Sequence, residues 1–303
     1  MKKLFTIIFM LVATISLKAQ MMNKNMYPCI WFNNNAKEAV DFYSEVFDDV
    51  KITSENPVVV LFEIGGAKFM ALNGGDKFRP NAAVSYFVYC EGSDKKIEHL
   101  YAELLKDGEV VMPLGKYDWS PKYAWVQDKF GISWQLDIDA INNPQKVVPT
   151  LLFTDGKSTR IQEAETYYTT LFKDSKSLVS YPFAEGSGMP EGTLLFSQVK
   201  LNGLIFNFIS GGNVQHGFDF TEGNSFVVEC ATQEEIDQYW RYFSKEGKES
   251  MCGWVQDKYG VWWQVVPAVL KDLMSTPGKA QKVTEAFLKM KKFDIETLKK
   301  AAE

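Results

Sequence analysis

The stretch Trp125-Val-Gln-Asp-Lys-Phe-Gly-Ile-Ser-Trp-Gln135 recurs later in the chain as Trp254-Val-Gln-Asp-Lys-Tyr-Gly-Val-Trp-Trp-Gln264. Eight of the eleven positions are identical, and two of the others exchange Phe for Tyr and Ile for Val. Self-similarity of this kind indicates an internal duplication, which decides the fold before any single element does. The Asp-Lys-aromatic-Gly core of each copy predicts a hairpin loop with glycine in the left-handed conformation.

Other blocks recur in the same order around this motif. They pair Pro28–Phe32 with Pro149–Phe153, Ala39–Phe47 with Ala164–Phe172, and Ser85–Cys90 with Ser225–Cys230. Apolar runs predict the strands, and apolar residues at helical spacing predict helices over 36–47 and 94–107. Ile64-Gly-Gly-Ala67 and Leu201-Asn-Gly-Leu204 predict two-residue hairpins. Each half, 26–140 and 147–267, is therefore predicted to be strand–helix–strand–strand–strand twice over, an α+β fold with two domains.

The two ends of the chain lie outside these repeats. Residues 268–303 carry apolar side chains at helical spacing and predict a C-terminal helical tail. At the other end, two lysines, a 14-residue apolar run from Leu4 to Leu17 and a small residue at Ala19 predict a signal peptide over residues 1–19. We expect export to the periplasm or medium. Translation from Met21 or a later methionine would instead give a cytoplasmic protein.

The composition excludes several classes of protein. Of the 303 residues, 46% are hydrophobic and 23% charged, which is typical of a soluble globular chain. A net charge of −5 argues against a nucleic-acid partner, and the apolar run at the N-terminus is shorter than the roughly 20 residues of a membrane span. The cysteines contain no Cys-x-x-Cys, and most lie in strand-like runs as expected of buried thiols; they are Cys29, Cys90, Cys230 and Cys252.

The repeated blocks resemble the vicinal oxygen chelate superfamily, which contains glyoxalases, bleomycin-resistance proteins and extradiol dioxygenases. More narrowly they resemble its PhnB-like, 3-demethylubiquinone methyltransferase-like branch. The segments that carry the resemblance are Trp31-Phe32 with Ala39–Tyr43, Phe69–Gly75, both Trp-Val-Gln-Asp-Lys motifs and Met290–Leu298. The resemblance covers residues 26–303. It implies tandem glyoxalase-like domains, each built from two βαβββ units whose sheet curls into a cup around a site.

Members that use a metal carry histidine at the start of a first strand and glutamate on a last strand, and the resemblance places other residues there. The first-strand positions are Pro28, Ser85, Pro149 and Ser225, the last-strand positions are Gln135 and Gln264, and a further position lies near Asn73 and Ser210. Zinc and similar cations need histidine, thiolate or carboxylate ligands. We therefore expect no metal and no other cofactor, and we interpret His99 and His216 as surface residues.

Strand alternation then predicts which side chains face each cup. The predicted ligand-binding residues are Asn73, Ser85, Phe87, Tyr89, Trp119, Ser133, Gln135, Ser225, Glu229, Trp262 and Gln264. Because Trp262 replaces Ser133, we expect the second cup to be the more filled one. The insertion Val111–Lys122 is either a lid over the first cup or a longer hairpin end. Gln135 could contact a ligand or serve the hairpin alone.

These expectations describe a metal-free protein that binds a small molecule, as a monomer with an internal pseudo-dimer or as a homodimer. One alternative is a metal-dependent lyase, isomerase or dioxygenase of the same superfamily. Another is a scaffold whose pockets have closed. The methyltransferase label has no support from the residues, because no Gly-rich strand-to-helix turn is followed by an acidic ribose ligand.

Overall fold

The computed structural model describes residues 25–303, so the expected signal peptide, residues 1–19, lies outside the described residues. None of the helices within that range is long and apolar enough to span a membrane. The helices are α2 (Ala36–Val46), α3 (Asp94–Leu104), α4 (Ile161–Leu171), α5 (Gln233–Ser244), α6 (Leu270–Leu273), α7 (Pro277–Phe287) and α8 (Ile295–Ala301), with the short 3-10 helix η1 (Asp155–Lys157).

The strands of the first half are β1 (Met26–Phe32), β2 (Lys51–Glu55), β3 (Val59–Ile64), β4 (Ala67–Asn73), β5 (Val84–Tyr89), β6 (Glu109–Tyr117), β7 (Ser120–Gln127) and β8 (Ser133–Asp137). Those of the second half are β9 (Val147–Phe153), β10 (Lys176–Pro182), β11 (Leu194–Leu201), β12 (Leu204–Ser210), β13 (Asn224–Cys230), β14 (Lys248–Glu249), β15 (Trp254–Gln256) and β16 (Trp262–Pro267). Each half thus contains two βαβββ units, as predicted.

Local signals in the sequence act as expected. The β3–β4 turn has Gly65 and Gly66 at φ 54° and 70°, and the β11–β12 turn has Asn202 and Gly203 at 50° and 80°. These are the positive φ values that a two-residue hairpin needs to match the twist of its strands. Helix α3 ends earlier than the predicted residue 107, because the chain turns into the left-handed region at Asp107.

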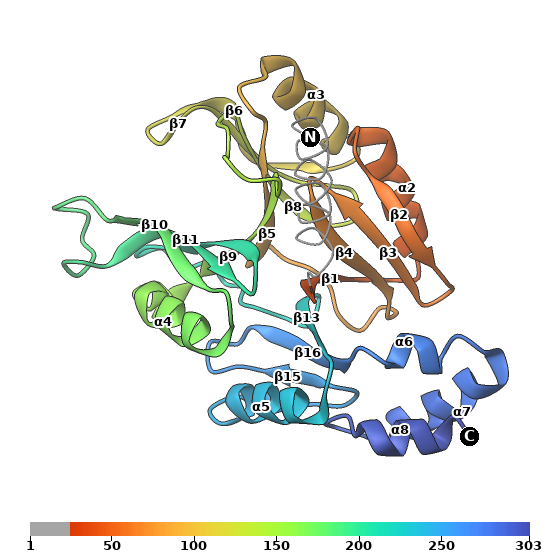
Figure 1. Ribbon diagram of the computed structural model, residues 1–303. Helices are drawn as coiled ribbons and strands as arrows, with labels where there is room; N and C mark the ends of the chain where they lie inside the picture. Colours follow the sequence, from red (N-terminus) through yellow and green to blue (C-terminus); the bar gives the residue numbers. More distant parts are fainter. Residues whose placement is uncertain (1–24) are drawn as a thin grey trace, which may run out of the picture.

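The strands form two eight-stranded sheets (Figure 1). Sheet A has the order β14-β15-β16-β13-β1-β4-β3-β2, and sheet B has the order β10-β11-β12-β9-β5-β8-β7-β6. Each sheet combines two units, but the units come from different halves of the chain. The antiparallel pairs β1–β13 and β5–β9 make the junctions at the centres of the sheets. Each sheet therefore takes one unit from each half, which is the arrangement of an intrachain pseudo-dimer.

Aromatic packing explains this exchange. Within the first half, Tyr86 of β5 contacts Phe69 of β4, and Trp134 of β8 contacts Tyr43 of α2, with ring centroids 5.1 and 5.3 Å apart. The two units of a half therefore pack through the sides of their sheets that carry the helices. Their opposite sides point away from each other, and each sheet is completed by a unit of the other half within the same chain.

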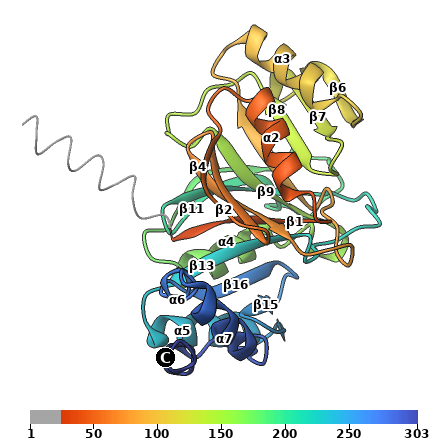
Figure 2. The same cartoon turned by 90° about the vertical axis from the view of Figure 1, so that its right-hand side faces the viewer.

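Two helices cover one side of each sheet. Helices α2 and α5 pack against sheet A, and α3 and α4 pack against sheet B. We call the opposite side of each sheet its inner face. Figure 2 shows the tail helices α6 and α7 beside α5, at the end of the molecule away from α3. The predicted tail is anchored there by the buried side chains of Val283, Phe293 and Leu298.

Strand β6 completes the second βαβββ unit of the first half, and it occupies much of the insertion Val111–Lys122, whose residues carry no clear strand pattern. It pairs with β7 through three register irregularities, and most of its side chains are exposed. Pro113 and Gly115 interrupt the alternation that would have indicated a strand. The segment Val111–Lys122 is thus the long end of the β6–β7 hairpin.

Candidate functional site

The repeated motif serves the fold, because its aspartate is buried and bonded on all sides. The Asp128 carboxylate accepts hydrogen bonds from Tyr43 Oη and Trp134 Nε1, both at 2.9 Å. The backbone N–H groups of Phe130 and Ile132 donate to its other oxygen at 2.9 and 3.0 Å. Burial raises the pKa of this carboxyl, and the four donors oppose that shift.

Asp257 repeats the arrangement in the second half. Tyr168 Oη and Trp263 Nε1 donate to it at 2.7 and 2.8 Å, and the N–H groups of Tyr259 and Val261 donate at 2.8 and 3.1 Å. Each aspartate therefore ties the helix of one unit to the hairpin of the next. This explains why the motif is so similar in both halves without assigning it any chemistry.

The inner face of sheet B brings together five of the predicted site residues: Ser85, Phe87, Tyr89, Ser133 and Gln135. Gln135 Nε2 donates to Ser85 Oγ at 2.7 Å, and Tyr123 Oη donates to Gln135 Oε1 at 2.6 Å. Trp125 Nε1 donates to Ser133 Oγ at 3.1 Å. Ser85, Ser133, Gln135 and Tyr123 are all buried. The polar groups at this centre are thus bonded to one another rather than presented to a ligand.

Side chains from the second half complete this face. Gln198 Nε2 lies 3.0 Å from both Tyr89 Oη and Asn207 Oδ1, and Asn207 Nδ2 donates to Thr150 Oγ1 at 3.3 Å. Phe87 is buried in the apolar cluster beside them. Burial raises the pKa of Tyr89 to about 12, so its hydroxyl is protonated at neutral pH.

Trp119 lies at the tip of the β6–β7 hairpin, near the edge of this face. Its ring stacks on Tyr117 with centroids 5.0 Å apart and meets Tyr123 edge-on at 5.5 Å. The indole is nevertheless 59% exposed. The hairpin therefore covers Tyr123, which in turn covers Gln135.

The inner face of sheet A has the same buried glutamine–serine pair at its centre, but different side chains lie around it. Gln264 Nε2 donates to Ser225 Oγ at 3.0 Å, which copies the Gln135–Ser85 pair. Cys29 is the pairing partner of Ser225 across the β1–β13 junction and is buried there. Burial raises the pKa of the Cys29 thiol to about 12, although hydrogen bonds to Gln264 and Ser225 oppose this. The thiol is therefore neutral at physiological pH.

A charged pair with a tyrosine lies at one end of this face. Glu229 Oε1 accepts hydrogen bonds from Tyr27 Oη at 2.6 Å and from Lys68 Nζ at 2.9 Å. The Lys68 ammonium also lies 3.7 Å from the centre of the Tyr27 ring. Burial and the Glu229 charge raise the pKa of Tyr27. Glu229 was predicted, whereas Tyr27 and Lys68 were missed. The sequence was interpreted with Pro28 as the inward residue of β1, but Tyr27 and Cys29 are the residues that face inward.

Half-buried apolar side chains lie around these polar groups on the inner face of sheet A. Trp254 lies between Trp31 and Trp262, with ring centroids 5.9 and 6.4 Å away. Trp31 and Trp254 are half-buried. Four aliphatic side chains packed against Tyr27, Cys29 and Val227 are also half-buried: Leu61, Met70, Leu72 and Val266.

The burial of the two faces is the reverse of what we expected from Trp262. Trp262 is buried as a floor beside Ser225, yet the face that carries it keeps half-exposed apolar walls. The face that carries Ser133 also has half-buried side chains, among them Tyr89 and Trp125, but Tyr123 covers its central glutamine. The cause is strand length, because β7 extends back to Ser120 and brings Tyr123 over Gln135, whereas β15 begins only at Trp254.

Asn73 has a different place from the one predicted. Its Oδ1 accepts the backbone N–H of Ala36 at 2.9 Å, and its Nδ2 donates to Pro57 O at 2.9 Å. The equivalent Ser210 likewise bonds to backbone, donating to Ser158 O at 2.7 Å. Both residues satisfy the backbone at the end of a strand and lie outside the inner faces.

The donors at both centres do not fit a metal. They are the hydroxyls of Ser85 and Ser225, the amides of Gln135 and Gln264, and the neutral thiol of Cys29. Across residues 25–303, no three His, Cys, Asp or Glu side chains gather in a way that could hold an ion. Neutral hydroxyl and amide groups are weak ligands for zinc or iron, so neither inner face offers the ligand set that a catalytic metal requires.

Comparison with known proteins agrees with this fold. The profile of the 3-demethylubiquinone-9 3-methyltransferase family matches residues 24–137 and 145–266. A PhnB protein from Bacillus cereus is 32% identical over 37% of this chain and 96% of its own, with a TM-score of 0.34. Glyoxalase I from Zea mays is 12% identical over 78% of this chain and 89% of its own, with a TM-score of 0.53, which is a likeness of fold.

No curated protein sequence matches the chain. The family profile nevertheless covers most of both halves, in two consecutive regions that coincide with the duplicated units. The chain therefore belongs to the 3-demethylubiquinone-9 3-methyltransferase family, a PhnB-like branch of the vicinal oxygen chelate superfamily.

Proposed function

We propose that this protein binds a small, mostly apolar molecule on the inner face of sheet A, without a metal. The observation that carries the proposal is the contrast between two faces of one design. Sheet B covers its central glutamine with Tyr123, whereas sheet A leaves a strip of half-buried aromatic and aliphatic side chains beside Gln264. A mostly apolar surface with a few placed polar groups is the usual composition of a ligand site.

The polar groups of this face favour an uncharged ligand with one hydrogen-bonding group. Glu229 and Lys68 compensate each other's charge, so this end of the face carries no net charge. Gln264 Oε1 and the remaining protons of Lys68 are an acceptor and donors for a hydroxyl or carbonyl group. The indoles of Trp31 and Trp254 provide flat surfaces that suit an aromatic or planar body.

The matched glutamines allow a sharp test. Neutral aromatic fragments are screened by thermal shift, and hits are measured by calorimetry on the wild type, Gln264→Ala and Gln135→Ala. We expect Gln135→Ala to keep the affinity of the hits, and Gln264→Ala combined with Trp254→Ala to lose it. Hits that survive the double variant, or that depend on Gln135, contradict the proposal.

The metal question is tested on the same hits. We expect unchanged affinity after treatment with EDTA and dialysis, because neutral donors line the site. Loss of binding that stoichiometric zinc, iron or manganese restores would favour the metal-dependent alternative.

We also propose that the protein is exported, on the residue pattern of the first 19 positions alone. Mass spectrometry of the protein from its native host should find Gln20 at the N-terminus. A chain that retains Met1, or that begins at Met21 or later, contradicts this.

A further inference from the structure

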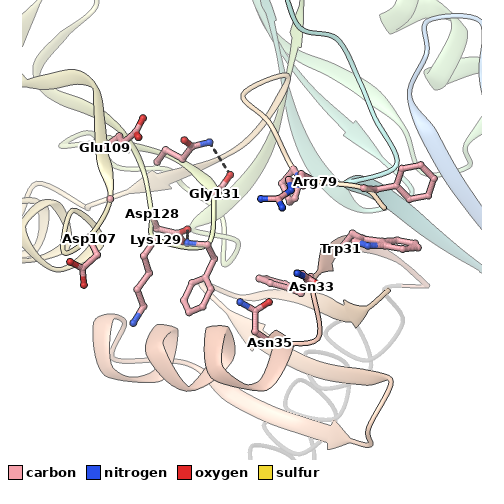
Figure 3. Close-up of a pocket in the computed structure, with 15 residues that line it drawn as sticks. Trp31, Asn33, Asn35, Arg79, Asp107, Glu109, Asp128, Lys129 and Gly131 are labelled. Carbon is pink, nitrogen blue, oxygen red and sulfur yellow. Dashed lines mark hydrogen bonds between the residues drawn. The ribbon is translucent and has the colours of Figure 1, made fainter. Parts of the chain in front are cut away.

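A separate pocket of about 500 Å³ opens within the first half of the chain (Figure 3). Four parts of the chain line it: the β1–α2 connection, residues 78–80 after β4, residues 107–109 between α3 and β6, and the β7–β8 hairpin. It shares only Trp31 with the inner face of sheet A, and the hydrogen bond from Trp31 Nε1 to Gly75 O, at 2.8 Å, fixes that ring between the two. The pocket is thus distinct from the site proposed above.

Within residues 25–303, several polar side chains on the pocket walls make no hydrogen bond or ion pair with the protein, and Arg79, Asn33 and Asn35 are among them. Figure 3 shows Arg79 on one wall and Asn33 and Asn35 on the other. Asn35 is the N-cap residue of α2, yet its side chain makes no capping bond, because Asn73 Oδ1 already accepts the N–H of Ala36. Over the described part of the chain, the Arg79 guanidinium and the Asn33 amide also make no hydrogen bond or ion pair with another side chain.

Aromatic rings form the rest of this end of the pocket. Phe78 meets Trp31 edge-on with centroids 4.9 Å apart, and Phe130 meets Phe32 at 6.3 Å. The Lys129 ammonium lies 5.2 Å from the Phe130 ring centre and adds a second positive charge. The carboxylates that line the pocket, Asp107 and Glu109, lie at the far end from Arg79 in Figure 3, and the buried Asp128 is fully bonded.

The second half fills the corresponding place with its own ion pairs. Counting back from the aligned blocks, Arg160 takes the position of Asn35 and Asp219 takes that of Arg79. Arg160 donates to both oxygens of Glu163 at 2.9 Å. Lys157 pairs with Asp219 and donates to Tyr259 O at 2.9 Å. The first half has no such pairs at these positions, and its pocket contains an arginine without an ion-pair partner among the described residues.

We propose that this pocket is a second binding site, which takes a small organic carboxylate with a flat apolar body. The Arg79 guanidinium receives the carboxylate in a two-point contact, the geometry in which such pairs are strongest. The amides of Asn33 and Asn35 donate to the same group from the opposite wall. The rings of Phe130 and Phe78 enclose the apolar body, and the Lys129 charge adds attraction for an anion.

The test uses benzoate, with its neutral isostere benzamide as a control, titrated into the whole protein and followed by calorimetry. We expect saturable binding of benzoate, weaker binding of benzamide, and an affinity for benzoate that falls as salt is added. Arg79→Asp installs the residue of the second half and should weaken benzoate roughly 10- to 100-fold, the range for a lost charge-assisted hydrogen bond. Arg79→Lys should lose less, because it keeps the charge.

A control variant separates this site from the inner face of sheet A. Gln264→Ala should leave the affinity for benzoate unchanged, since Gln264 does not line the pocket. The proposal is overturned if benzoate shows no saturable binding, if benzamide binds equally well, or if Arg79→Asp has no effect. Binding that is lost in Gln264→Ala and kept in Arg79→Asp would place benzoate on the inner face instead.

Discussion

Replacing Asp128 by asparagine tests whether the repeated motif holds the two units of a half together. The substitution keeps the shape of the side chain but turns one acceptor oxygen into an NH₂ donor. In the structure every neighbour of that carboxylate is a donor: two side chains and two backbone N–H groups. The new amide nitrogen must therefore face two donors in either orientation.

The magnitude follows from which donors can adapt. The Tyr43 hydroxyl can rotate and accept from the new amide, whereas the Trp134 indole N–H and the backbone groups are donors only. Each buried donor left without an acceptor costs about 1–3 kcal/mol. Removal of a buried charge offsets part of this, since burial raises the pKa of Asp128. We expect Asp128→Asn to lower the free energy of unfolding by about 2–4 kcal/mol.

Urea unfolding at neutral pH, followed by tryptophan fluorescence and circular dichroism, measures this loss. Asp118→Asn is the matched control, because Asp118 is exposed in the β6–β7 turn and should change stability by less than about 0.5 kcal/mol. Tyr43→Phe removes a single donor and should cost about 1.5–3 kcal/mol. A loss below about 0.5 kcal/mol in Asp128→Asn, or lost ligand binding at unchanged stability, would refute the structural role.

Three further predictions concern single groups. Ser93 caps α3 by accepting the N–H of Lys96, whereas the side chain of Asn35 makes no capping bond to α2. Ser93→Ala should therefore lower the free energy of unfolding in urea by about 0.5–2 kcal/mol, and Asn35→Ala should lower it by clearly less. Equal losses would contradict this. Hydrogen bonds from Arg160 lower the pKa of Glu163 from 4.5 to about 2. Its ionised form therefore stabilises the fold above the ordinary pKa, and the stability difference between wild type and Glu163→Gln should shrink as pH falls from about 5 toward 2; a constant difference is the contrary result. All four cysteines are free and only Cys252 is half-exposed, so a thiol reagent should modify one thiol in the native protein and four after denaturation.

Much of the fold could be predicted from the sequence because local rules produce it. The Gly65-Gly66 and Asn202-Gly203 turns, the glycine of each Asp-Lys-aromatic-Gly loop and the apolar stripe of α2 all act within a few residues. Because the chain is duplicated, each local pattern occurs in both halves, and the prediction for one half supported that for the other.

The pairing of units could not be predicted, because it depends on contacts between residues far apart in the chain. The junction that sets Cys29 opposite Ser225 leaves no local mark in either strand. The extent of β6 could not be predicted either, because Pro113 and Gly115 disrupt its alternation.

In the candidate site too, local features could be predicted and contacts between distant residues could not. Alternation placed Gln135 and Gln264 on the inner faces correctly, since a period of two holds along any regular strand. It could not show that Tyr123 covers Gln135 while no corresponding tyrosine covers Gln264, because that depends on where the neighbouring strands β7 and β15 begin. The same rule missed Tyr27, because it started from Pro28 as the inward residue of β1, whereas Tyr27 and Cys29 face inward. It also gave no sign that the strands of Tyr27 and Lys68 lie beside that of Glu229.

The central claim, that sheet A carries the ligand site and sheet B does not, is tested most directly by the indole N–H resonances of the tryptophans. Trp254 and Trp262 lie on the inner face of sheet A, and Trp125 lies on that of sheet B. Neutral aromatic fragments are titrated into ¹⁵N-labelled protein. We predict saturable shifts of the Trp254 and Trp262 resonances while that of Trp125 stays unmoved. Shifts at Trp125 alone, or at none of the three indoles with any fragment, would contradict the account.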